Sequence, residues 1–130
     1  MKRLIIAAEA VLTWTAGQCA AADFDGSKLL ICANIEAVDC GAGQACTKGR
    51  PDDFDAPTFM RIDFGKKIIV GPKRTTPIVS LEKSANQLLL HGTEMGYAWS
   101  LALDTSNGKL AATLVDRNEV MVLFGACTPL

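Results

Sequence analysis

Apolar and polar side chains alternate with a period of two along most of the chain after residue 57. Met60, Ile62 and Phe64 alternate with Arg61 and Asp63, for example. This period places every second side chain on one face, which is typical of a half-buried strand. No stretch of eleven residues after residue 22 has the apolar stripe of an amphipathic helix. The pattern therefore predicts an all-β fold.

The alternation also predicts which side chains point toward the core. In each segment we assign the apolar set of alternate residues to the inner face. The predicted inward residues are Met60, Ile62, Phe64, Val79, Leu81, Leu88, Leu90, Tyr97, Trp99, Leu101, Leu103, Leu110, Ala112, Leu114, Val120, Val122 and Phe124.

Turn signals separate the segments, among them Gly65-Lys66, Gly71-Pro72 and Asn107-Gly108. Together with residues 28–38, they give about eight antiparallel strands joined by short connections. An up-and-down β-barrel would leave no free strand edges, and a two-sheet β-sandwich is the alternative. The interior of an eight-stranded barrel is either filled by side chains or able to hold one small ligand.

The N-terminus has the pattern of a secretory signal peptide. Lys2 and Arg3 precede an apolar run over residues 4–16, and small residues at 19–22 precede Asp23. The run is shorter than a bilayer-spanning helix. A lipid anchor at Cys19 or a buried N-terminal helix fits less well. We therefore expect residues 1–22 to be a cleaved signal peptide and residues 23–130 to be one periplasmic or secreted domain without a membrane span.

Charge and composition exclude several functions. The formal net charge is −1, and it becomes −2 when Lys2, Arg3 and Glu9 are removed with the signal peptide. Nucleic-acid binding would need a marked basic excess, so no nucleic-acid partner is expected. With His91 as the single histidine, no nucleophile–base pair can be identified. We predict a protein that is not an enzyme and has no cofactor.

Four cysteines follow the predicted signal peptide, namely Cys32, Cys40, Cys46 and Cys127. An even number in a small exported domain indicates two disulfides, with three possible pairings. Their spacing lacks the C-x-x-C pattern of zinc sites, so no metal site is predicted. In a barrel with an even number of strands, the first strand starts beside the end of the last. This geometry favours Cys32–Cys127 and Cys40–Cys46.

One observation counts against that pairing. Cys32 has the same parity as the polar residues Asn34 and Glu36, which would place it on a polar face.

The long connection over residues 39–57 is the best functional candidate, since loops of this length are usually functional or disordered. It could equally serve only to plug the end of the barrel. It contains the acidic run 52–55, which favours turn capping over a calcium site. The basic residues Lys66, Lys67, Lys73 and Arg74 are expected to be solvated hairpin tips, with an anion site as the alternative.

The inward aromatic residues Phe64, Tyr97, Trp99 and Phe124 are the predicted ligand-binding residues. We expect an exported, non-catalytic β-barrel protein that binds a small apolar or amphipathic ligand, because barrel mouths are recurrent ligand sites. The alternative is a protein-interaction module, such as an inhibitor of a cell-envelope or proteolytic enzyme, with residues 39–57 as its contact element. The oligomeric state is open.

Three segments, GPKRTTP (71–77), ATLVDR (112–117) and LFGACTPL (123–130), resemble those of a group of small exported bacterial proteins of unknown function. The resemblance covers most of the chain after residue 22 and implies export, but it brings no activity or catalytic residue. The strand count is similar to that of lipocalins and streptavidin, which is an analogy of architecture alone.

Overall fold

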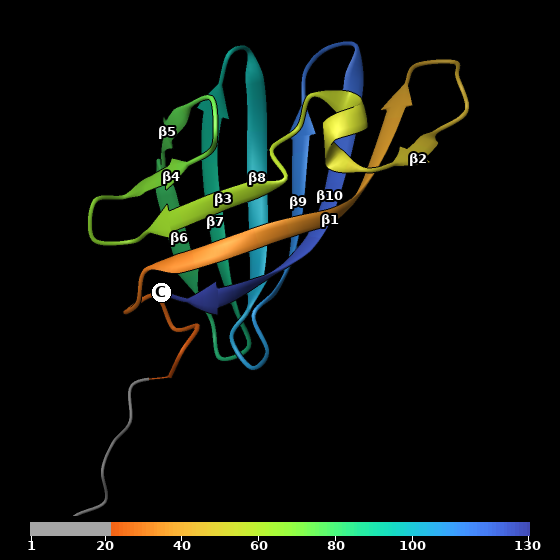
Figure 1. Cartoon of the computed structure of the whole chain (residues 1–130). Helices are drawn as coiled ribbons and strands as arrows, with labels where there is room; N and C mark the ends of the chain where they lie inside the picture. Colours follow the sequence, from red (N-terminus) through yellow and green to blue (C-terminus); the bar gives the residue numbers. More distant parts are fainter. Residues whose placement is uncertain (1–21) are drawn as a thin grey trace, which may run out of the picture.

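Ten antiparallel strands and one short 3₁₀ helix make up the computed structural model, which describes residues 22–130 (Figure 1). Apart from Ala22, the predicted signal peptide lies outside the described residues. The elements are β1 (Leu30–Gly41), β2 (Thr47–Gly49), η1 (Pro51–Phe54), β3 (Phe59–Asp63), β4 (Ile68–Val70), β5 (Thr75–Pro77), β6 (Ser80–Lys83), β7 (Gln87–Glu94), β8 (Tyr97–Asp104), β9 (Lys109–Val115) and β10 (Glu119–Pro129). The predicted all-β fold is confirmed. Within residues 22–130, no helix is long and apolar enough to cross a membrane.

The strands form one curled half-barrel sheet in the order β5-β4-β3-β1-β10-β9-β8-β7-β6, and β2 pairs separately with β1 (Figure 1). The first strand therefore lies beside the last, as the up-and-down arrangement predicts. The two ends of the sheet, β5 and β6, are separated in the chain only by Ile78 and Val79. The backbone N–H of Ile78 donates to the carbonyl of Lys67, next to β4, whereas that of Val79 donates to the carbonyl of His91 in β7, each at 2.8 Å.

The predicted number of strands is too low by two, and the two additional strands arise in two separate segments of the chain. The segment around Ile78 forms two short strands, because it changes its hydrogen-bonding partner from β4 to β7. The connection over residues 39–57 supplies the other strand, β2, which pairs with residues 37–39 of β1.

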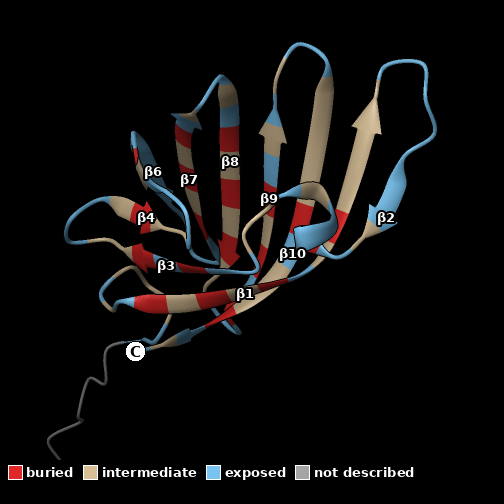
Figure 2. Cartoon of the chain, turned by 45° about the horizontal axis from the view of Figure 1, so that its top comes forward, coloured by how far each residue is buried: buried red, intermediate tan, exposed pale blue. Residues whose placement is uncertain are grey.

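The core lies on the inner face of the curl (Figure 2). Most of the predicted inward positions are confirmed as buried, namely Met60, Ile62, Leu88, Leu90, Trp99, Leu101, Leu103, Leu110 and Ala112. Their burial stabilises the fold by the hydrophobic effect, at about 25 cal/mol for each Å² of apolar surface removed from water.

The inward orientation predicted for Val79 and Leu81 is wrong. Val79 is 72% exposed and Leu81 is exposed as well, whereas Ile78 is buried. The change of partner at this point turns Ile78 inward, so a period of two counted from Val79 selects the outer face.

The faces of β10 are also the reverse of the prediction. Leu123 is buried and Met121 packs against the core, whereas Phe124 is 44% exposed. Val120 and Val122, which share the parity of Phe124, are only partly buried. Every residue from 120 to 124 is apolar, so alternation could not choose between the two faces of this strand.

Both predicted disulfides are present. Cys32 and Cys127 are cross-strand partners in β1 and β10 and are bonded over a sequence separation of 95 residues. Cys40 is bonded to Cys46, six residues on.

A β-bulge at Ile35 explains why Cys32 faces inward although it shares its parity with Asn34 and Glu36. The register of β1 against β10 shifts between Asn34 and Glu36, and Ile35 is 69% exposed. The extra residue keeps Cys32 and Asn34 inward before it and turns Ala37 inward after it. Gly125 faces the bulge, and a Cβ there would lie only 2.2 Å from the carbonyl oxygen of Ala33.

Candidate functional site

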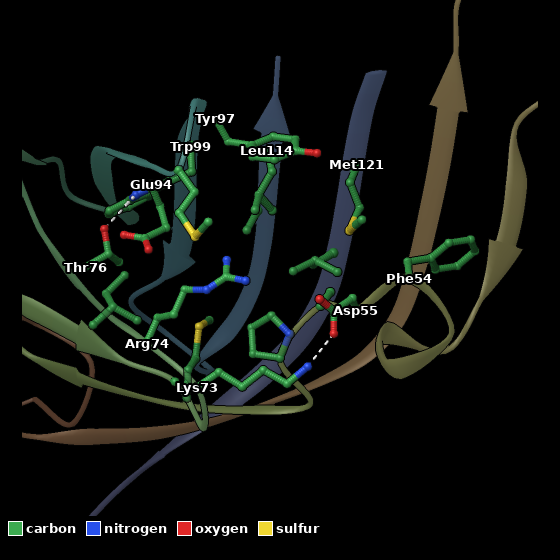
Figure 3. Close-up of a pocket in the computed structure, with 18 of the residues that line it drawn as sticks. Phe54, Asp55, Lys73, Arg74, Thr76, Glu94, Tyr97, Trp99, Leu114 and Met121 are labelled. Atoms are coloured by element: carbon green, nitrogen blue, oxygen red, sulfur yellow. Dashed lines mark hydrogen bonds and ion pairs between the residues drawn. The ribbon is translucent and has the colours of Figure 1, made fainter. Parts of the chain in front are cut away.

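A cavity of about 400 Å³ lies at the mouth of the half-barrel. One wall consists of two rows of side chains that run across β8, β9 and β10, and Figure 3 labels Trp99, Leu114 and Met121 of the first row. The cross-strand register defines these rows as Trp99–Leu114–Met121 and Leu101–Ala112–Leu123. Ala112 is the smallest side chain of its row, between two leucines, and so leaves space in the wall. The wall can accommodate an apolar group.

Trp99 is held in place at the cavity wall. Its indole Nε1 donates to the hydroxyl of Thr76 at 3.3 Å, and that hydroxyl donates to the carbonyl of Thr93 at 3.2 Å. Gly92 is the cross-strand partner of Trp99, and a Cβ at Gly92 would lie 2.3 Å from the ring. The ring therefore lies directly against the backbone of β7, an approach that only glycine permits.

The connection over residues 39–57 supplies part of the facing wall, beside residues of β3, β4, the β4–β5 loop and β5. Phe54, Ala56 and Pro57 line the cavity. Asn34, which is almost fully buried, donates from its side-chain amide to the carbonyl of Pro57 at 2.7 Å and thereby attaches the end of the connection to β1. The sequence-based candidate loop therefore forms part of the cavity, with a 3₁₀ turn and a short strand within it.

A salt bridge joins this wall to the β4–β5 loop at the rim. Lys73 donates to the carboxylate of Asp55, and both residues line the cavity (Figure 3). The hydrogen bond from Lys73, together with its charge and that of Arg74, holds the pKa of Asp55 below its usual value. The other two carboxylates of the acidic run, Asp52 and Asp53, form ion pairs with Arg50. Within residues 22–130, no group of three His, Cys, Asp or Glu side chains is placed to hold a metal ion.

A second polar contact joins two residues that line the cavity from β8 and β10. The phenol of Tyr97 reaches over β9 and donates to the carboxylate of Glu119 at the start of β10. This hydrogen bond, reinforced by desolvation and the negative charge of Glu119, raises the pKa of Tyr97 to about 12. The contact links β8 to β10 at the cavity mouth.

Tyr97 is the only tyrosine of the chain, so its ionisation can be followed alone by the ultraviolet absorbance of the phenolate. We expect the folded protein to titrate near pH 12, and Glu119→Gln to move the midpoint toward 10.0, the ordinary value, because the carboxylate charge is removed. A raised pKa in the folded state means that this contribution to stability is present below pH 10 and is lost as the pH rises through 12. Denatured protein is the control, and equal midpoints in both folded variants would contradict the assigned hydrogen bond.

The four predicted ligand-binding residues do not lie together. Tyr97 and Trp99 line the cavity, Phe64 packs on the core away from it, and Phe124 points outward from β10. For Phe124, an inward side chain is a wrong prediction. The sequence did contain a signal for the inward face of β10. Cys127 and Met121 have the same parity, and the predicted disulfide from Cys127 to β1 favours the inward face for both residues.

The sequence reasoning missed other lining residues. Three methionines, Met60, Met95 and Met121, and two glutamates, Glu94 and Glu119, line the cavity from different parts of the chain. Methionine is flexible and polarisable and adapts to ligands of different shape. Of the predicted basic set, Lys73 and Arg74 line the cavity, while Lys66 and Lys67 lie in the turn between β3 and β4.

Comparison with protein-family models, with curated proteins and with solved structures finds no match to this chain. The resemblance to small exported bacterial proteins stays a prediction.

Proposed function

We propose that this protein is an exported, non-catalytic binding protein that takes a small amphipathic ligand into the cavity at the mouth of its half-barrel. The observation that carries the proposal is a cavity of about 400 Å³ with apolar walls and a charged rim. Ligand sites typically have volumes of about 300–1,000 Å³, with mostly apolar walls and a few polar groups that fix orientation.

The arrangement of the lining supports an amphipathic ligand over a purely apolar one. The two rows across β8–β10 offer apolar contact from the core side of the cavity, whereas its charged lining residues are exposed or half-buried, namely Asp55, Lys73, Arg74, Glu94 and Glu119. An apolar tail would gain from leaving water, and a polar head would stay near these charges.

The two disulfides support the exported location that the N-terminal pattern predicts, because disulfides persist in oxidising compartments.

Trp99 provides a direct assay of binding. Trp14 lies in the predicted signal peptide, so residues 23–130 have one tryptophan fluorophore, Trp99, in the cavity wall. We expect the uncharged probe N-phenyl-1-naphthylamine to bind saturably at one site and to take up excitation energy from Trp99.

Adjacent alanines of β9 supply a matched pair of variants. Ala112 faces the cavity and Ala111, its neighbour, faces the outer side of the sheet. Ala112→Phe should weaken probe binding at least about tenfold, or about 1.4 kcal/mol, by filling the cavity, whereas Ala111→Phe should leave it unchanged. Non-saturable binding, or equal losses in the two variants, would refute the proposed site.

A second function, contact with another protein, has one specific observation in its favour. Ile35, Phe59 and Phe124 are exposed on the outer faces of β1, β3 and β10, which are adjacent strands. Exposed apolar side chains that gather on one face are typical of interaction surfaces. If this function is correct, Phe124→Glu should abolish binding of the protein partner and Ala112→Phe should leave that binding intact. The ligand-binding proposal instead expects Ala112→Phe to weaken binding.

A further inference from the structure

The charged side chains at the cavity mouth fall into two groups. Lys73 is bound to Asp55, and Glu119 accepts from Tyr97. Arg74 and Glu94 also line the cavity, but within residues 22–130 neither side chain takes part in an ion pair or a side-chain hydrogen bond. In the part of the chain that the structure describes, the cavity therefore has one cation and one anion outside the protein's ion pairs and side-chain hydrogen bonds, although the charge of Arg74 also acts on Asp55.

These two groups are placed toward a ligand. Figure 3 shows the Arg74 side chain extending into the cavity from the β4–β5 loop, and the Glu94 carboxylate beside the wall formed by Thr76 and Trp99. They come from opposite ends of the sheet, since Arg74 precedes β5 and Glu94 ends β7. A bound head group would lie between them, above the apolar rows that begin with Trp99.

We propose that the natural ligand has a zwitterionic head group, with its negative group bound by Arg74 and its positive group bound by Glu94, and a single apolar tail on the β8–β10 wall. This inference rests on the proposed ligand-binding function. The guanidinium offers several donors in a planar fork that suits carboxylate and phosphate oxygens. The Glu94 carboxylate attracts an ammonium group, and the Trp99 ring at the same wall can add a cation–π contact.

Charge complementarity favours a zwitterion over an ion of one sign. The rim carries Lys73 and Arg74 against Asp55, Glu94 and Glu119, a formal charge of −1, so the mouth does not select strongly for an anion. A purely anionic head would satisfy Arg74 and be repelled by Glu94. A purely cationic head would satisfy Glu94 and be repelled by Arg74. A head with both charges satisfies both side chains.

The test uses four compounds with the same decyl tail and different heads: decylphosphocholine, decyl sulfate, decyltrimethylammonium and decyl maltoside. Each displaces N-phenyl-1-naphthylamine from the protein that begins at Asp23, at low salt and below its micelle-forming concentration. We expect decylphosphocholine to bind about fivefold tighter than each of the other three, since charge pairs at an exposed rim contribute modestly.

Single substitutions then separate the two charges. Arg74→Gln should shift the preference toward decyltrimethylammonium, and Glu94→Gln should shift it toward decyl sulfate. The matched controls are Arg61→Gln and Glu82→Gln, at exposed positions of β3 and β6. They should keep the order of affinities for the four compounds that the parent protein has. Equal affinity for decyl maltoside and decylphosphocholine, or an order that neither rim variant changes, would overturn the zwitterion inference. Loss of saturable binding of the uncharged probe in the parent protein would instead overturn the proposed function.

Discussion

Replacing both Cys32 and Cys127 with alanine should lower the free energy of unfolding by roughly 4–5 kcal/mol, the largest effect expected of any change considered. The bridge closes a loop that spans 95 residues, so its removal restores much conformational freedom to the unfolded chain. It also joins the first strand of the sheet to the last, and Cys32 is fully buried. Urea unfolding followed by circular dichroism measures the change.

The second disulfide is the matched control. Cys40 and Cys46 are only six residues apart, so the same entropy model assigns their bridge about 2 kcal/mol. Replacing this pair should free the connection after β1 and leave the sheet folded, which limited proteolysis of that connection would show. Equal losses of stability in the two double variants would contradict the assigned role of the long-range bridge.

Replacing Trp99 with alanine should lower the free energy of unfolding by about 3–5 kcal/mol. The ring is only 8% exposed, is bonded through Nε1 to Thr76 and packs on Gly92. Its removal enlarges an existing cavity and leaves the Thr76 hydroxyl without its donor. Circular dichroism is again the suitable probe, because the variant lacks the reporting fluorophore.

An aromatic residue on the outer face of the sheet tests whether burial causes the loss of stability expected for Trp99→Ala. Phe59 is 57% exposed, so Phe59→Ala should change stability by no more than about 0.5 kcal/mol. A loss below about 1 kcal/mol for Trp99→Ala would mean that the indole does not occupy the core side of β8.

The sequence predicted the interior best where only one set of alternate residues is apolar. In β8, Trp99, Leu101 and Leu103 alternate with small or polar residues, so only one face of the strand gains much free energy from burial. All three large side chains are buried. In β10 both sets are apolar, and the prediction selected Phe124 where the structure buries Leu123. Periodicity has no information about orientation when both faces would gain from burial.

The cavity was only partly predictable for a related reason. Tyr97 and Trp99 lie on the clearly patterned strand, and both were identified. Arg74 and Glu94 lie in or beside turns, where no period exists, and they are 20 residues apart in the chain. Only the curl of the sheet brings such positions to one cavity. That curl depends on pairing between strands far apart in the chain, which a local sequence pattern does not show.

The sequence alone predicted the all-β class and, from the expected order of strands in a barrel, favoured the pairing of Cys32 with Cys127 that the structure contains. The all-β class follows from local alternation and turn residues, which are properties of neighbouring residues, and the favoured pairing follows from the need of a sheet to pair its edges. Only the tertiary structure decided the bulge at Ile35, the change of partner at Ile78 and the cavity between the β8–β10 wall and the connection after β1. Each of these depends on contacts between segments far apart in the chain, where small shifts of register change which side chains face inward.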